Sequence, residues 1–173
     1  MPNMSNSVDN YLQLVVFNLD NEEYGVEIGQ VREIIKMEEI TKIPRAPDYI
    51  EGVINLRGQV TTVISLRKKF GLGVKENDQY TRIIVAEIEG LTLGITVDAV
   101  NEVLKLPMKN IEPTPAIVAN DVGTKYLRGV GKLNDRLLIL LDMQKVMNGN
   151  EIEEIDELDT SEILEPVKSS EEQ

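Results

Sequence analysis

The sequence predicts a mainly β protein made of two similar subdomains. Val and Ile contribute 18 residues each to a chain of 173, and β-branched side chains favour strands. Short apolar runs alternate with Gly, Asn, Asp and Pro turn signals, a spacing typical of small barrels and sandwiches. The pattern of the first half of the chain also recurs in the second half, which indicates an internal duplication.

Eight segments have the apolar, β-branched character of strands, and a tight hairpin is expected at Glu89-Gly90. Two short helices directly follow strands. The first spans 65–71 with Ser65 as its N-cap, the second spans 142–149 with Asp142 as its N-cap, and each ends on a glycine. The predicted strands are 11–19, 23–28, 34–37, 60–65, 80–88, 91–97, 103–106 and 137–141.

Two pairs of matching segments define the duplication. Residues 24–34 are echoed by residues 93–103 at an offset of 69, and residues 49–53 are echoed by residues 126–130 at an offset of 77. The difference predicts an insertion in the second copy, within the loop 113–123. A period this long is unlike that of a solenoid repeat. It predicts two subdomains packed side by side, with a groove at their seam.

The composition excludes several kinds of chemistry. The chain has no Cys and no His, which removes disulfides, thiolate nucleophiles, Ser-His-Asp triads and the commonest metal ligands. The formal net charge of −12 argues against binding a nucleic acid backbone or an anionic membrane surface. No apolar run is long enough for a membrane span and no signal peptide is recognisable, so we expect a cytoplasmic protein.

Most of the negative charge lies at the C-terminal end. Residues 151–173 hold ten acidic residues and one basic residue, which leaves residues 1–150 with 20 acidic against 17 basic residues. Segments of this kind stay solvated. We therefore expect a disordered acidic tail over 149–173 that is dispensable for folding, with at most a short frayed helix where Ile152, Ile155 and Leu158 recur.

The segment from Gly52 to Val60 is the strongest candidate site. It places Asn55 and Arg57 in an apolar run bounded by glycines, and a guanidinium in such a run needs a partner or access to water. Two interpretations stay open. Arg57 either holds the two subdomains together by hydrogen bonds to backbone carbonyls, or anchors a protein interface.

Four further apolar residues lie at equivalent places of the two copies, Val31 and Ile34 in the first and Val100 and Val103 in the second. They are either core residues or the lining of a partner groove at the seam. The residues alone leave two other functions open. One is a carboxylate-dependent hydrolase, and the other is a small-molecule-binding β-barrel.

Several runs of residues match a known family. The most specific is Gly52-Val53-Ile54-Asn55-Leu56-Arg57-Gly58, and the others are 17–28, 31–34, 93–100 and 126–131. Over residues 11–148 the chain resembles CheW-like proteins, the bacterial chemotaxis adaptors. This resemblance implies an all-β fold with short helices, in which two similar five-stranded β-barrel subdomains from an internal duplication are interleaved near residues 20–70 and 90–148.

The resemblance also implies a function. CheW-like proteins are non-catalytic adaptors that couple methyl-accepting chemotaxis receptors to the histidine kinase CheA in signalling arrays. The implied partners are the regulatory domain of a CheA-like kinase and the cytoplasmic tip of a receptor, with no nucleic acid, no membrane insertion and no cofactor. We expect the helical receptor tip in the seam groove and a pseudo-symmetric kinase contact, because the kinase domain has a paralogous fold. The protein is then cytoplasmic and recruited to membrane receptor arrays.

The same resemblance implies roles for individual residues. Arg57 matches the family's key arginine, Val31 a receptor-coupling position, and Glu33 the kinase-facing stretch. Ile117 occupies a position where some members carry an aromatic residue used in ring contacts. The full set of predicted receptor- and kinase-binding residues is Val31, Glu33, Ile34, Gly52, Asn55, Leu56, Arg57, Val100, Val103 and Ile117. No catalytic or metal-binding residue is predicted.

Overall fold

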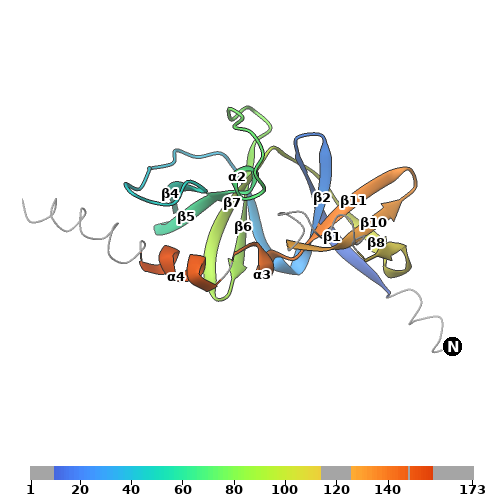
Figure 1. Ribbon diagram of the computed structural model, residues 1–173. Coiled ribbons are helices and arrows are strands. Elements are labelled where there is room, and N and C mark those ends of the chain that lie inside the picture. The colour runs from blue at the N-terminus through green and yellow to red at the C-terminus, as the bar shows by residue number, and fades with distance from the viewer. Residues whose placement is uncertain (1–9, 114–125, 148, 158–173) are drawn as a thin grey trace, which may run out of the picture.

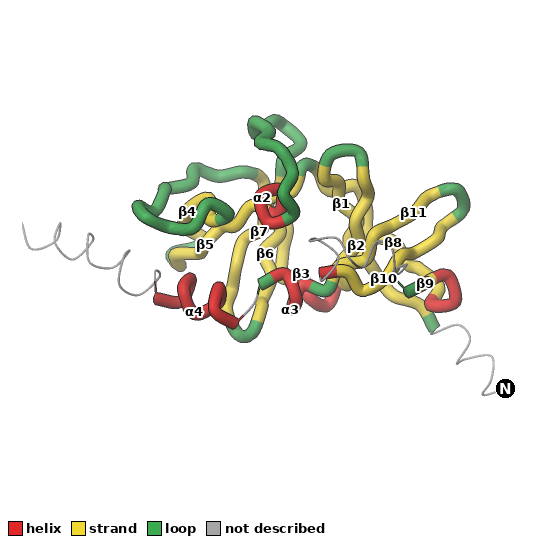
Figure 2. The backbone as a smooth tube through the Cα atoms, viewed as in Figure 1, coloured by secondary structure: helices red, strands yellow, loops and turns green. Residues whose placement is uncertain are grey.

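The chain folds mainly into strands that form two sheets, which lie side by side in Figures 1 and 2. The computed structural model describes residues 10–113, 126–147 and 149–157. Within these residues one sheet has five strands in the order β3-β6-β7-β5-β4, and the other has six in the order β8-β1-β2-β11-β10-β9. The prediction of a mainly β protein with two similar subdomains is confirmed.

The five-stranded sheet consists of β3 (Val31–Lys36), β4 (Ile50–Leu56), β5 (Gln59–Ser65), β6 (Arg82–Ile88) and β7 (Leu91–Val97). The six-stranded sheet consists of β1 (Tyr11–Leu19), β2 (Glu22–Glu27), β8 (Ala99–Pro107), β9 (Ile111–Glu112), β10 (Leu127–Leu133) and β11 (Arg136–Leu141). Two single-turn 3-10 helices, η1 (Ile28–Gln30) and η2 (Met108–Asn110), follow β2 and β8. The α-helices are α2 (Leu66–Lys69), α3 (Met143–Val146) and α4 (Gly149–Glu157).

Each sheet takes a hairpin from the opposite half of the chain. The hairpin β1–β2 pairs with β8 and β11 in the six-stranded sheet, and the hairpin β6–β7 pairs with β3 and β5 in the five-stranded sheet. Under the two offsets, β3-β6-β7-β5-β4 maps strand by strand onto β8-β1-β2-β11-β10. The ranges predicted near 20–70 and 90–148 therefore correspond to the two repeats of the sequence. They do not correspond to the two sheets, because each sheet contains strands from both repeats.

Buried apolar side chains fill the contact between the sheets. The described residues form three buried clusters, one between the sheets, one in the six-stranded sheet and one in the five-stranded sheet. Phe17 and Leu19 of β1 meet Ile84, Leu93 and Ile95 of the opposite sheet in the first cluster, and all are fully buried. The described part of the seam is thus largely packed core, where an open groove was expected.

The two predicted short helices lie at the junction of the sheets (Figure 2). Their N-caps are as predicted. The Ser65 hydroxyl accepts a hydrogen bond from the Lys68 N–H at 3.2 Å, and the Asp142 carboxylate accepts one from the Gln144 N–H at 3.0 Å. Both helices are a single turn, shorter than predicted.

The sequence did not predict β4, β9 or β10, and of these β4 and β10 each contain a glycine at a bulge. The register of β4 shifts at Gly52 and that of β10 at Gly129. A Cβ on Gly52, whose φ is 146°, would overlap the Thr41 carbonyl, and a Cβ on Gly129 would lie 2.7 Å from the Glu112 carbonyl oxygen. Both glycines therefore allow a neighbouring backbone to approach closely, so the predicted site residue Gly52 has a backbone role.

The acidic C-terminal segment begins as an ordered helix. Ile155 of α4 is fully buried in the cluster between the sheets, and Ile152 packs partly against it. Lys69, whose side chain is only 5% exposed, donates a hydrogen bond to Glu151 at 2.6 Å. The expected disorder from residue 149 onward therefore does not hold for 149–157, because burial of its two isoleucines fixes the helix. Residues 158–173 lie outside the described part of the chain.

Candidate interaction surface

The Asn-Leu-Arg-Gly run forms a tight turn between β4 and β5. Arg57 and Gly58 are its two central residues, with φ values of 49° and 86°, and positive φ at both positions defines a type I′ hairpin turn. The Asn55 side chain accepts a hydrogen bond from the Gly58 N–H at 2.8 Å. The motif thus projects the arginine from the end of the hairpin.

Arg57 forms an ion pair with Glu33 on β3. Its Nη1 donates to Glu33 Oε1 at 2.9 Å, and its Nη2 bonds to the second carboxylate oxygen. The Arg57 side chain is 71% exposed and that of Glu33 is 28% exposed. The hydrogen bonds from Arg57 lower the pKa of Glu33 below its ordinary value, so the carboxylate stays charged.

This pairing corrects the expected position of Arg57. The apolar neighbours Ile54 and Leu56 are buried within the five-stranded sheet, but the guanidinium is exposed at the sheet's edge and bonds neither to the other sheet nor to backbone carbonyls in the hydrogen bonds described. Arg57 lies in the turn of the hairpin and not in the strand, so the alternation of buried and exposed side chains along β4 does not apply to it. The interpretation that Arg57 holds the subdomains together is therefore wrong.

A second ion pair lies on the same sheet beside the first. Arg32 of β3 donates to Glu87 at 3.3 Å and to the Thr92 hydroxyl at 3.1 Å. Arg32, Glu33 and Arg57 line one shallow depression together with Leu56, Gln59, Val85 and Thr92. The lining of the depression is therefore mainly charged and polar, with Leu56 and Val85 as its apolar residues.

The six-stranded sheet carries an equivalent arrangement that the sequence analysis missed. An offset of 69 residues maps Glu33 onto Glu102 of β8, and Glu102 accepts a hydrogen bond from Arg136 of β11 at 2.8 Å. Arg136 also binds Glu23 at 2.8 Å, and Asn101 donates to Glu23 at 3.1 Å. Applying the repeat offset to the predicted Glu33 would have found Glu102, whereas Arg136 has no arginine counterpart in the first copy.

The predicted site residues fall into three groups. Arg57, Asn55, Ile34 and Val103 are exposed, whereas Val31, Val100 and Glu33 are partly buried. Gly52 and Leu56 are buried. Ile117 lies outside the described residues.

The structure brings only some of these residues together. Glu33, Leu56 and Arg57 meet at the depression. Ile34 pairs with Ile84 of the core between the sheets, and so lies on the opposite face of β3 from Glu33. Val100 and Val103 belong to β8 of the other sheet, at the places equivalent to Val31 and Ile34.

The described residues offer surface chemistry suited to association. No group of three or more acidic side chains that could hold a metal ion occurs among them. Nor is any helix within those ranges long and apolar enough to cross a membrane. Each sheet carries an Arg–Glu pair at its surface, and its edge strand carries an exposed aliphatic residue, Ile34 or Val103. The protein is thus a two-sheet β protein whose edges are candidate protein-interaction surfaces.

Comparisons with known proteins give the family. The model of the CheW-like domain matches residues 13–151, so the chain belongs to the CheW-like domain family. The chemotaxis protein CheW of Klebsiella aerogenes is 39% identical over 144 residues, covering 83% of this chain and 86% of that protein. The chemotaxis protein CheW of Helicobacter pylori is 35% identical, covering 79% and 81%.

A solved structure agrees with this assignment. The crystal structure of the scaffolding protein TtCheW from Thermoanaerobacter tengcongensis matches with a TM-score of 0.73 and 39% identity. The match covers 82% of this chain and 90% of that one. The family resemblance stated from the sequence is therefore confirmed, and with it the mainly β, two-sheet fold.

Proposed function

We propose that this protein is a non-catalytic chemotaxis adaptor that couples methyl-accepting receptors to a CheA-like histidine kinase. The relatives named above are chemotaxis and scaffolding proteins, which supports the adaptor role. The observation that carries the proposal is the pair of equivalent ionic edges, Arg57–Glu33 on one sheet and Arg136–Glu102 on the other. An adaptor must hold two partners, and a duplicated edge supplies two related surfaces.

The Arg57–Glu33 edge is the proposed kinase contact. Arg57 is largely exposed, and its guanidinium has N–H donors beyond the two that bond to Glu33, which favours a partner carboxylate or backbone carbonyl. Ile34 is 37% exposed but lies on the opposite face of β3, so it is not part of this contact. Arginine is itself one of the residue types that anchor interfaces most often.

The receptor contact is proposed on β8, the strand that carries Glu102 of the second ionic edge, where Val100 and its counterpart Val31 of β3 reach the rim of the central cluster. Val31 and Val100 both pack partly against this cluster and both stay partly accessible. A helical hairpin from a receptor tip presents an apolar stripe that such residues can bury. In this scheme the protein is cytoplasmic and reaches membrane arrays only through its receptor.

Binding assays with purified partners test the proposal. The kinase regulatory domain and a soluble receptor tip should each bind the full chain in calorimetry, and Glu33→Lys should weaken only kinase binding, by about tenfold. Unchanged kinase affinity would place that contact elsewhere. The hydrolase and small-molecule alternatives predict substrate turnover or a ligand-dependent rise in melting temperature, and either result would favour them instead.

A further inference from the structure

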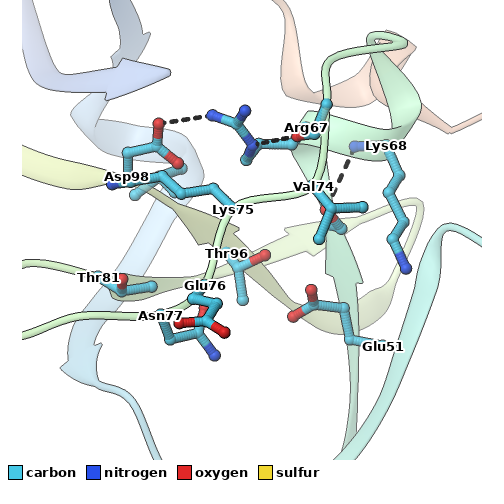
Figure 3. A pocket seen from close by; sticks show the side chains of 13 residues that line it. Glu51, Arg67, Lys68, Val74, Lys75, Glu76, Asn77, Thr81, Thr96 and Asp98 are labelled. Carbon is cyan, nitrogen blue, oxygen red and sulfur yellow. Dashed lines mark hydrogen bonds and ion pairs between the residues drawn. The ribbon is translucent and has the colours of Figure 1, made fainter. Parts of the chain in front are cut away.

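Arg67 of α2 connects the two sheets through an ionic cluster with Asp98, which is largely buried, and Asp20, whose side chain is 46% exposed. Its Nη1 donates hydrogen bonds to Asp98 Oδ2 at 2.8 Å and to Asp20 Oδ1 at 2.6 Å. The side chains of Arg67 and Asp98 are only 13% and 11% exposed. Figure 3 shows the guanidinium directed at the Asp98 carboxylate above the pocket that both residues line.

The three residues lie where the chain passes from one sheet to the other. Arg67 belongs to the helix that follows β5 of the five-stranded sheet. Asp98 is the residue between β7 of that sheet and β8 of the six-stranded sheet, and Asp20 lies in the β1–β2 turn of the six-stranded sheet. Asp98 also accepts a hydrogen bond from the Asp20 N–H at 2.8 Å, so the cluster ties this turn to the crossing point.

The equivalent place in the second copy has no arginine–aspartate pair. The offset of 77 residues maps Arg67 onto Gln144 of α3, and the offset of 69 maps Asp20 onto Glu89. Gln144 accepts a hydrogen bond from the Glu89 N–H and donates one to the Glu87 carbonyl, both at 3.1 Å. Gly29 stands where the first site has Asp98. In both copies a side chain of the short helix is hydrogen-bonded to the hairpin turn of the other sheet. Only the Arg67 site uses charge-assisted bonds, which are the stronger kind.

One strand connects the Arg67 site to each interaction edge. β5, which ends before α2, begins at the turn that carries Arg57. β8, which begins after Asp98, carries Glu102 and Val103. We propose that Arg67 is a positioning residue, which fixes the angle between the sheets and so holds the two edges in the geometry needed to bind two partners at once. The functional half of this inference rests on the proposed adaptor function.

Distance measurements test the structural half without any partner. The native chain has no cysteine, so Lys36→Cys with Lys105→Cys places two spin labels at exposed, equivalent positions of β3 and β8. We expect Arg67→Gln to broaden or shift the distance distribution between the labels. Gln144→Ala, at the equivalent site of the second copy, should leave it unchanged. An unchanged distribution in folded Arg67→Gln protein would overturn the proposal.

A second variant covers the case in which Arg67→Gln does not fold. Asp98→Asn keeps the shape of the side chain and removes its charge, so it should also broaden the distribution. A narrow, native-like distribution in Asp98→Asn protein would equally count against the proposal.

Binding separates positioning from a general structural role. Arg67→Gln should bind the kinase domain alone and the receptor tip alone within about twofold of the native affinity, and should lose about tenfold in receptor-stimulated kinase activation. If Arg67→Gln weakened kinase binding, receptor binding and kinase activation equally, its role would be a general structural one. Full kinase activation despite an altered distance between the labels would also refute the proposal that Arg67 supports coupling. If the native chain binds neither partner, the adaptor function fails, and the distance measurement still decides the role of Arg67.

Discussion

Arg57 and Glu33 belong to opposite edges of one sheet, yet their side chains form a two-point ion pair. The order β3-β6-β7-β5-β4 separates β3 from the β4–β5 turn by the width of the sheet. The sheet must therefore curl until its two edges face each other. Because most of the Arg57 side chain is exposed, the pair is better suited to meeting a partner than to stabilising the fold.

Arg57→Ala should consequently separate binding from stability. We expect a melting temperature close to that of the native protein, and a loss of at least about tenfold in kinase affinity. Arg57→Lys should not restore binding, since an ammonium lacks the planar fork of donors. Lys132→Ala is the matched control, because Lys132 forms a similarly exposed pair with Glu112 at 2.8 Å. A native kinase affinity in Arg57→Ala protein would contradict the proposed contact.

The titration of Glu33 should report the same ion pair. Arg57 lowers the pKa of Glu33 below the ordinary 4.5, so the carboxylate form is favoured in the folded state. The small stabilisation from the pair is therefore present above the ordinary pKa and is lost as the pH falls through the lowered value. Carboxyl NMR should show Glu33 titrating below 4.5 in the native protein, and closer to 4.5 in Arg57→Ala. Identical titration curves would mean that the pair does not form in solution.

Residues of α4 should contribute to folding stability. Ile155 is fully buried, so Ile155→Ala should lower the free energy of unfolding by about 2–4 kcal/mol through lost burial and a cavity. Ile152→Ala is the control and should cost less, because Ile152 is only partly buried. Chemical denaturation measures both. Equal, small effects would show that α4 does not pack in solution, and would restore the expectation of a tail that is dispensable from residue 149.

Gly52 should tolerate no side chain. A Cβ at this position would overlap the Thr41 carbonyl at a positive φ, so Gly52→Ala should destabilise the protein by about 2–4 kcal/mol. Gly73→Ala is the matched control, since no atom lies within 4 Å of its added Cβ, and it should be nearly neutral. A loss of partner binding in a fully stable Gly52→Ala protein would instead give Gly52 the direct contact role first predicted for it.

Local patterns of the sequence predicted most of the strands and both N-caps. The predicted strands 11–19 and 91–97 coincide with β1 and β7, because their apolar and β-branched residues lie on packed faces. The strand over Ile50–Leu56 was missed, since Gly52 interrupts the pattern and local propensity disfavours glycine in strands. The reason for that glycine is a close approach by Thr41, which depends on residues distant in sequence.

The remaining differences also come from long-range contacts. One interpretation placed Arg57 at the seam because its neighbours are apolar. The β4–β5 turn instead directs its side chain outward to Glu33. The spacing of Ile152 and Ile155 indicated at most a short frayed helix, because the order of α4 depends on burial of Ile155 against distant strands. The pairing of Arg136 with Glu102 links residues of different strands, and no local pattern specifies such a pair.

The exchange of hairpins has a consequence for the origin of the fold. If a chain containing only β1 to β5 kept these strands in their present places, the hairpin β1–β2 would lack its neighbours β8 and β11, and β3 to β5 would lack a central hairpin. Two copies of such a half-length chain could complete both sheets by swapping hairpins, which is a domain-swapped dimer with twofold symmetry. Fusion of two such copies would make the swap permanent and free each half to diverge. The charged Arg67 and the neutral Gln144 are one difference between the two corresponding halves.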